Sequence, residues 1–121
     1  MSALVWIAVG LLGGIGALCR FFVDGIVSAR AGRDFPIGTM VVNVTGAALL
    51  GMLVGLGLKG DRLVLAGTAT LGSYTTFSTW MLETQRLAED GELALAGANV
   101  LISLGVGLGA AALGRSIGAH L

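Results

Sequence analysis

The chain has 121 residues, of which 55% are hydrophobic and only 12% carry a charge. A soluble domain normally has about a quarter of its residues charged, so this composition indicates a protein that lies in lipid rather than in water. The 7 basic and 7 acidic residues cancel, which gives no indication of nucleic-acid binding, and a single cysteine excludes a disulfide framework or a cysteine metal cluster.

Long uncharged runs follow one another along the chain. They are Met1–Cys19, Phe35–Leu58, Leu63–Leu82 and Leu93–Gly114. Each is close to the roughly 20 apolar residues that a helix needs to cross a ~30 Å hydrocarbon core. The first run could be a secretory signal peptide, but no basic residue precedes it and no small-residue cleavage site ends it. We therefore expect it to remain as a helix.

These runs predict an all-α membrane protein, with a single four-helix transmembrane domain over residues 1–121. The helices are expected at 3–28, 36–58, 62–89 and 92–115. Four short helices enclose no pore, so we expect any transport function to need a second subunit.

The second and third helices each contain polar residues where lipid would favour apolar ones. Asn43 lies within the second helix, where a buried amide needs hydrogen-bond partners or a water-filled cavity. The segment Gly72–Trp80 holds one glycine, five Ser and Thr hydroxyls and three aromatic rings, which weaken helix continuity. We predict a mid-membrane break near 72–76, where free backbone groups could hold an ion. An intact packing helix rich in hydroxyls is the alternative.

Polar and small residues also share one face of the fourth helix. Asn99, Ser103 and Gly107 follow one another at four-residue spacing. The two polar side chains could line a polar track, or they could hydrogen-bond backbone carbonyls within the bundle. Glycines such as Gly51 and Gly55 allow helix backbones to approach closely, either within one subunit or between two.

The basic residues give almost no orientation signal. One side of the membrane would carry Lys59, Arg62 and Arg115, and the other would carry Arg20, Arg30, Arg33 and Arg86. Because topology follows the bias of Lys and Arg, a difference of one residue predicts dual topology. Copies inserted in opposite directions could then assemble as an antiparallel dimer.

Three stretches resemble the signature segments of the Fluc/CrcB family of fluoride channels, in the family's order and at its spacing. They are Gly13–Phe21, Gly38–Gly46 and Gly72–Trp80. Chain length and helix count agree as well, so the resemblance covers essentially the whole chain. Its most specific part is Thr75–Thr79.

The resemblance implies a passive fluoride-selective ion channel, not an enzyme, that exports cytoplasmic F⁻ and so lowers fluoride toxicity. It implies a multi-pass protein of the cell inner (plasma) membrane and an antiparallel dimer with two fluoride pathways. The partner would be a second copy of the chain or a paralogous subunit. The implied pathway residues are Asn43, Thr76, Phe77, Ser78, Trp80 and Ser103.

The resemblance also implies what the individual groups do. Asn43 would hydrogen-bond the permeating fluoride, while Phe77 and Trp80 would point their positively polarised ring edges at it. Arg20 and Glu83 match residues of a pore vestibule. The backbone carbonyls of Gly72 and Thr75, with their copies in the dimer, would hold a structural Na⁺ at the dimer centre.

Several positions depart from the family pattern. Trp80 stands where a second Phe is usual, so this position keeps a ring edge, becomes larger and gains an N–H donor. Asn99 stands where Tyr is common, Gly107 replaces a hydroxyl, and Ser73–Tyr74 replaces smaller residues. These departures make a heterodimer with a paralogue an alternative to the homodimer.

Two other function classes compete with the channel. A small dual-topology, proton-coupled exporter of the multidrug type needs a membrane-embedded carboxylate, typically in its first helix, and Met1–Cys19 has none. A non-conducting subunit, which serves only the assembly of a heterodimeric channel, would need no more than the glycine-rich helix faces.

Overall fold

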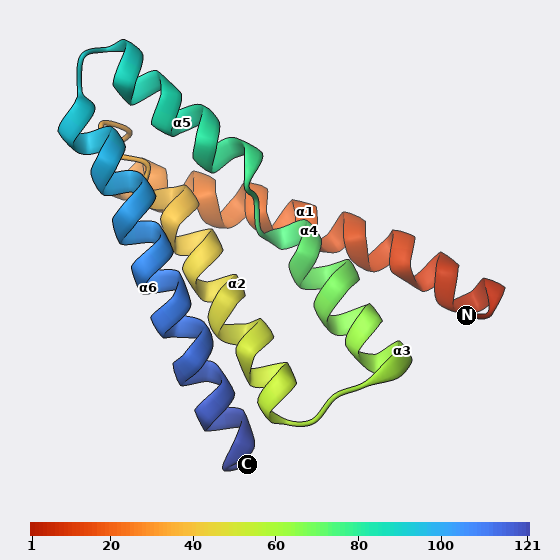
Figure 1. Ribbon diagram of the computed structural model, residues 1–121. Coiled ribbons are helices and arrows are strands. Elements are labelled where there is room, and N and C mark those ends of the chain that lie inside the picture. Colours follow the sequence, from red (N-terminus) through yellow and green to blue (C-terminus); the bar gives the residue numbers. More distant parts are fainter.

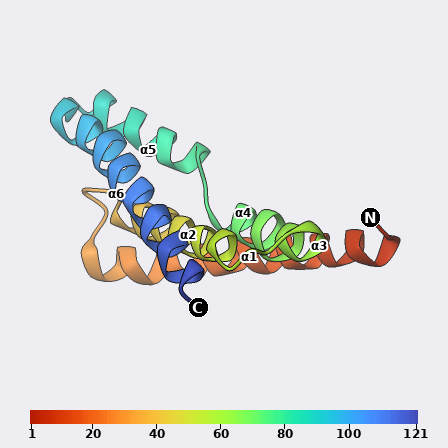
Figure 2. The ribbon, with the colours of Figure 1, turned by 60° about the horizontal axis from the view of Figure 1, so that its bottom comes forward.

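The computed structural model describes residues 1–121, and its secondary structure is entirely helical (Figure 1). The long helices are α1 (Ala3–Ala31), α2 (Ile37–Gly55), α5 (Ser78–Glu89) and α6 (Leu93–Ala119). Between α2 and α5 lie α3 (Gly60–Leu63), the π-helix η1 (Val64–Leu71) and the short α4 (Gly72–Tyr74). Helices α2 and α6 run side by side, while α1 packs against η1, α4 and α2 (Figures 1 and 2).

Capping groups and glycines set the helix ends, whereas charged residues do not mark them. Helix α1 starts after Ser2, whose hydroxyl accepts a hydrogen bond from the Val5 N–H at 3.3 Å, and continues past the expected end at residue 28. It stops at Gly32, whose φ of 82° is readily adopted only by glycine. Likewise, α2 ends before Gly57, whose φ is 81°, rather than at residue 58. Helix α6 continues beyond Arg115, so a basic residue in a helix does not mark its end.

Helices α2 and α6 pack through glycines of the same chain. A Cβ atom at Gly51 would overlap the carbonyl oxygen of Ala111, and one at Gly114 would overlap the carbonyl oxygen of Ala48. Gly55 makes the same kind of approach to the Arg115 carbonyl. Such backbone contact needs small residues at the interface. Of the two interpretations of Gly51 and Gly55, close packing within one subunit is therefore correct.

The third predicted helix, 62–89, is divided into several parts. The helical path continues through Gly72–Tyr74 and is interrupted over Thr75–Phe77, so the break overlaps the predicted 72–76 but lies nearer its end. After an extended link, α5 leads on to the end of the molecule where α6 begins, and the first half of α6 returns alongside α5 (Figures 1 and 2). The π-helix was not predicted. Within it the Thr70 hydroxyl donates to the Leu65 carbonyl, five residues back, at 2.7 Å.

Three helices, α1, α2 and α6, are long and apolar enough to cross a membrane, with lengths of 29, 19 and 27 residues. The pieces of the third segment are individually shorter. Only 15 of the 121 residues are buried within the chain, and large apolar side chains cover its outside. This distribution is the opposite of a water-soluble fold and identifies a membrane protein, whose apolar surface is covered by lipid or by another chain.

Candidate functional site

The break in the third helix is held by Asn43 of α2. The Asn43 Oδ1 accepts a hydrogen bond from the Thr76 N–H, and Asn43 Nδ2 donates to the Thr76 carbonyl, both at 2.8 Å. Thr75 has an extended backbone, with φ −82° and ψ 163°, which directs Thr76 toward α2. One side chain therefore replaces two backbone hydrogen bonds that the interrupted helix gives up. The second N–H of the Asn43 amide is not used.

The break that these two hydrogen bonds hold open leaves backbone oxygens without helical partners. In an unbroken helix the Thr76 N–H would bond to the Gly72 carbonyl, but here it bonds to Asn43. The Thr75 carbonyl accepts no backbone N–H. No group of His, Cys, Asp or Glu side chains could hold a metal ion. Since free backbone carbonyls are ligands for monovalent cations, the oxygens of Gly72 and Thr75 fit the predicted Na⁺ in their chemistry.

A cavity of about 510 Å³ opens beside the break. Five of the six predicted pathway residues line it: Asn43, Thr76, Phe77, Trp80 and Ser103. Gly72, Thr75 and Gly107 line it as well. The sixth, Ser78, is not among the lining residues, although its exposed hydroxyl lies 3.5 Å from that of Thr76. The structure thus brings together side chains from α2, the break, α5 and α6. We call this space the break cavity.

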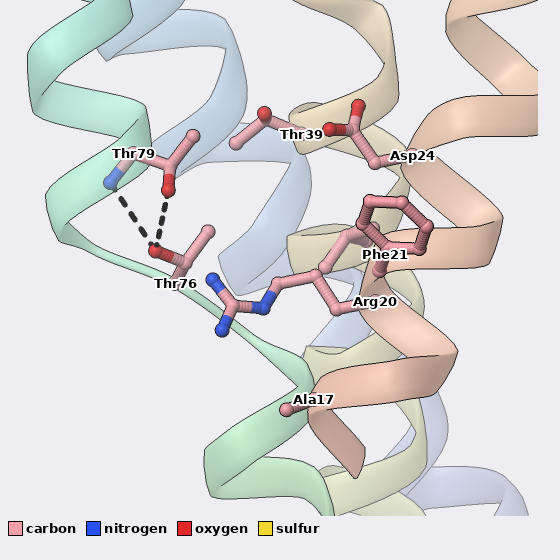
Figure 3. A pocket seen from close by; sticks show the side chains of 8 residues that line it. Ala17, Arg20, Phe21, Asp24, Thr39, Thr76 and Thr79 are labelled. Carbon is pink, nitrogen blue, oxygen red and sulfur yellow. Dashed lines mark hydrogen bonds between the residues drawn. The ribbon is translucent and has the colours of Figure 1, made fainter. Parts of the chain in front are cut away.

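A second cavity, of about 360 Å³, lies between α1, α2 and the start of α5 (Figure 3). Arg20 extends from α1 toward Thr76, and the Thr76 hydroxyl in turn bonds to the N–H and hydroxyl of Thr79 at 3.2 and 3.1 Å (Figure 3). Asp24 and Thr39 also line the space. We call it the Arg20 cavity. Because Thr76 lines both cavities, the break is the wall that they share.

The two predicted vestibule residues differ in their positions. Arg20 lines the Arg20 cavity, whereas Glu83 does not. Glu83 lies on α5 one helical turn beyond Thr79, which does line it. One carboxylate oxygen of Glu83, Oε1, is buried without a hydrogen-bond partner. A buried unpaired oxygen is costly, and the Thr39 hydroxyl lies close enough to act as a donor to this carboxyl group.

Phe77 and Trp80 meet at right angles beside the break cavity. Their ring centroids are 5.8 Å apart and the planes cross at 89°, the edge-to-face arrangement that aromatic quadrupoles favour. Phe77 is 69% exposed in the single chain. The indole N–H of Trp80 donates to the main-chain carbonyl of Asn99 at 3.0 Å. The extra donor expected at this position therefore already has a partner.

Asn99 faces the protein interior rather than a polar track. Its side chain is only 1% exposed, and its Nδ2 donates to the Thr84 hydroxyl at 2.8 Å and toward the Trp80 carbonyl at 3.4 Å. The alternative in which Asn99 bonds within the bundle is thus the correct one, while Ser103 does line the break cavity. Sequence reasoning missed Thr84. Its position one turn after Trp80, where its hydroxyl bonds the Trp80 carbonyl at 2.8 Å, was the available signal.

Comparison with known proteins gives a family match over most of the chain. The family model described as "CrcB-like protein, Camphor Resistance (CrcB)" matches residues 7–115. The chain is 56% identical over 113 residues to "Fluoride-specific ion channel FluC 2" of Mycolicibacterium paratuberculosis, covering 93% of each protein. It is 56% identical over 117 residues to the protein of the same name from Mycobacterium tuberculosis, covering 97% of this chain and 93% of that one. It is 46% identical over 116 residues to "Fluoride-specific ion channel FluC" of Syntrophotalea carbinolica, covering 92% and 93%.

Proposed function

This chain belongs to the CrcB family, and from that premise we propose that it is a subunit of a passive, fluoride-selective ion channel that exports cytoplasmic F⁻. The relatives' names describe an ion channel, so the chain is not an enzyme. The observation on this chain that best supports a fluoride channel is the break cavity. Its amide, hydroxyls and aromatic edges converge from four segments on one small space beside a broken helix.

The proposed assembly is an antiparallel dimer of dual-topology subunits in the cell inner (plasma) membrane. The third segment, α3 to α5, would provide the fourth crossing of a single four-helix domain. Two features support the assembly. The break cavity is open in the single chain, with Phe77 largely exposed, so a second subunit could complete its wall. The near-equal numbers of basic residues at the two membrane faces favour insertion in both directions.

Fluoride would pass the break by exchanging water for fixed donors. The unused Nδ2–H of Asn43 can donate to it, and the ring edges of Phe77 and Trp80 carry partial positive charge. The hydroxyls of Thr76, Ser78 and Ser103 would extend this path. Arg20 would attract the anion into the Arg20 cavity, and Glu83 would lie at the border of that vestibule. Weak, repeated contacts of this kind suit conduction, because an ion must leave each site as readily as it enters.

We further propose that the carbonyls of Gly72 and Thr75, with their copies in the partner, hold a structural Na⁺ at the dimer centre. What supports this is the loss of their helical hydrogen-bond partners at the break. The cation would supply fixed positive charge and join the two broken helices. The chain's own residues would supply only oxygen atoms, and Asn43 would keep those oxygens free by binding Thr76.

Acid–base chemistry explains the use of such a channel. Neutral HF crosses bilayers, loses its proton at cytoplasmic pH and is trapped as F⁻. The membrane potential is worth about 2.3 kcal/mol per elementary charge per 100 mV, so a passive anion path is enough to drive the ion out. A fluoride exporter of this kind therefore requires neither ATP nor a proton-carrying carboxylate.

Pairing with a paralogue is the second candidate. Several relatives carry numbered names, FluC 2 in Mycobacterium tuberculosis and FluC 1 in Nocardia farcinica, which favours more than one subunit type. In that case this chain alone would form no conducting pore. The proton-coupled exporter remains a weaker alternative, since the chain's first 19 residues hold no carboxylate.

The test is fluoride efflux from liposomes that contain the purified protein, read with a fluoride electrode, with chloride release as the control. We expect rapid fluoride loss with chloride retained, and loss of this efflux when Na⁺ is replaced by N-methylglucamine throughout purification and assay. Efflux that is unchanged without Na⁺ would exclude the structural cation. Release of both anions would contradict selectivity.

A double variant and a second subunit separate the remaining alternatives. Asn43→Ala combined with Phe77→Ile should abolish fluoride efflux, whereas a non-conducting assembly subunit would register no change in permeability. A stable protein that releases neither anion would indicate a missing paralogue, and co-expression with that paralogue should then restore efflux. Fluoride release that requires a proton gradient would instead support the exporter.

A further inference from the structure

We propose that Asn99, together with Thr84, is a positioning residue that fixes Trp80 in the wall of the break cavity. The main-chain carbonyl of Asn99 holds the indole, while the Asn99 amide and the Thr84 hydroxyl hold the backbone of residue 80. As a result, this ring meets the anion with its edge and not with its N–H. The inference rests on the proposed fluoride function. It assigns to two residues outside the pathway a role in setting the pathway's specificity.

The first step is the partner of the indole N–H. Trp80 Nε1 donates to the main-chain carbonyl of Asn99 at 3.0 Å, within the normal range for a hydrogen bond, and a substitution of the Asn99 side chain leaves this acceptor in place. Turning this N–H toward a passing anion would break the hydrogen bond that joins the indole to α6. The donor that Trp has and Phe lacks is therefore used to join α5 to α6. What remains for the anion is the ring edge, the same chemistry that Phe77 offers.

The second step is the backbone of Trp80. Its carbonyl accepts the Thr84 hydroxyl at 2.8 Å and lies 3.4 Å from Asn99 Nδ2, which also donates to the Thr84 oxygen at 2.8 Å. The three residues therefore form a closed set of hydrogen bonds. Residue 80 is held at both ends, by its indole nitrogen and by its main-chain oxygen.

The third step is accessibility. The Asn99 side chain is 1% exposed and does not line the break cavity, so an anion there cannot reach it. Asn99 must act through its neighbours. One is Trp80, whose ring stands edge-to-face with Phe77, and another is Ser103, whose hydroxyl donates to Asn99 Oδ1 at 3.4 Å. That bond is long, so the Ser103 hydroxyl can leave it to meet an anion.

The experiment uses the full chain in a Trp6→Phe background, which leaves Trp80 as the only tryptophan. The test variants are Asn99→Ala and Thr84→Val, and Thr84→Ser is the conservative variant that keeps the hydroxyl. The matched control is Gln85→Ala, which removes only an exposed hydrogen bond to Glu89 on the same helix. Each protein is assayed for fluoride and chloride release from liposomes and for time-resolved fluorescence anisotropy of Trp80.

We expect Asn99→Ala and Thr84→Val to lower the ratio of fluoride to chloride release about tenfold, the effect of losing one good hydrogen bond. Both remove the side-chain bond between residues 84 and 99 that holds the Trp80 backbone, so both should add a fast component to the decay of Trp80 anisotropy, although the main-chain acceptor of the indole remains. Thr84→Ser and Gln85→Ala should match the parent.

Several outcomes would overturn the inference. Asn99→Ala and Thr84→Val proteins with the parent's anion ratio and the parent's anisotropy would show that neither side chain positions Trp80. A lower yield of folded protein with an unchanged anion ratio would make their role merely structural. If the parent itself releases no fluoride, the proposed function fails, and the anisotropy alone decides whether the indole is held.

Discussion

At the scale of single residues, Asn43 combines the two environments that its sequence context predicts. An amide in a membrane helix needs partners or a cavity, and Asn43 has both. It pairs with the Thr76 backbone and lines the break cavity. The sequence could predict that Asn43 matters, but not that Thr76 is its partner. The two residues are 33 positions apart, and no local pattern encodes their contact. Likewise, the sequence predicted that Trp80 adds an N–H donor but not what it binds, because its partner on α6 lies 19 positions away.

Substitution of Asn43 should lower both fluoride efflux and the stability of the fold. Asn43→Ala leaves the Thr76 N–H and carbonyl unpaired, at about 1–3 kcal/mol for such a buried group, so we expect lower thermal stability and at least about a tenfold loss of fluoride efflux. Asn43→Asp keeps the acceptor for the Thr76 N–H but places negative charge beside the anion. It should therefore lose efflux, and it should also lose stability, because its second oxygen faces the Thr76 carbonyl oxygen that Asn43 Nδ2 binds.

Thermal unfolding in detergent, followed by size-exclusion chromatography, measures the stability of these variants, and the liposome assay measures efflux. Thr45→Val is the control on the same helix, since it removes a hydroxyl bonded to the Val41 carbonyl and to Tyr74 without touching Thr76. Parent-like efflux from Asn43→Ala would remove Asn43 from the fluoride pathway.

At the scale of elements, the sequence pattern predicts which helices form, whereas the exact break and the π-helix depend on tertiary packing. Apolar run length predicted α1, α2 and α6, and polar composition predicted that the third helix would be interrupted. The predicted break near 72–76 overlaps the observed one only in part, because composition does not show which residues of the segment lose their helical hydrogen bonds. The hydrogen bonds from Asn43 to the Thr76 backbone accompany an interruption at Thr75–Phe77. The π-helix had no sequence signal. It lies where α1 approaches so closely that a Cβ at Gly16 would overlap the Thr70 carbonyl oxygen.

The glycine contacts between α2 and α6 predict which substitutions the bundle tolerates. In Gly114→Val the new side chain would overlap the Ala48 carbonyl oxygen, and a backbone atom cannot move aside as a flexible side chain can. We expect a loss of at least about 1–3 kcal/mol, the usual cost of overpacking, and a sharp fall in folded protein. Gly109→Val is the matched control, because the same change on the same helix meets no atom within 4 Å. Thermal stability in detergent compares the two, and equal losses would show that helix propensity rather than packing is responsible.

At the scale of the whole molecule, composition predicted a membrane protein. The predicted assembly rests instead on the nearly equal numbers of Lys and Arg residues at the two membrane faces. The exposed apolar surface and the open break cavity of a single chain are consistent with a partner subunit. They do not choose between a second copy and a paralogue. The distribution of Lys and Arg carries the prediction of dual topology, because it determines how each copy inserts.

Single cysteines at opposite ends of the helices test this prediction without altering any charge. In a Cys19→Ala background, Ala31→Cys and Leu121→Cys lie at opposite ends of the chain's first and last helices, and both positions are exposed. If copies insert both ways, a membrane-impermeant maleimide should label about half of each variant in intact cells, and permeabilisation should expose the rest. Full labelling at one position with full protection at the other would mean a single orientation. An antiparallel homodimer would then be impossible, and the opposite-facing subunit would have to be a paralogue.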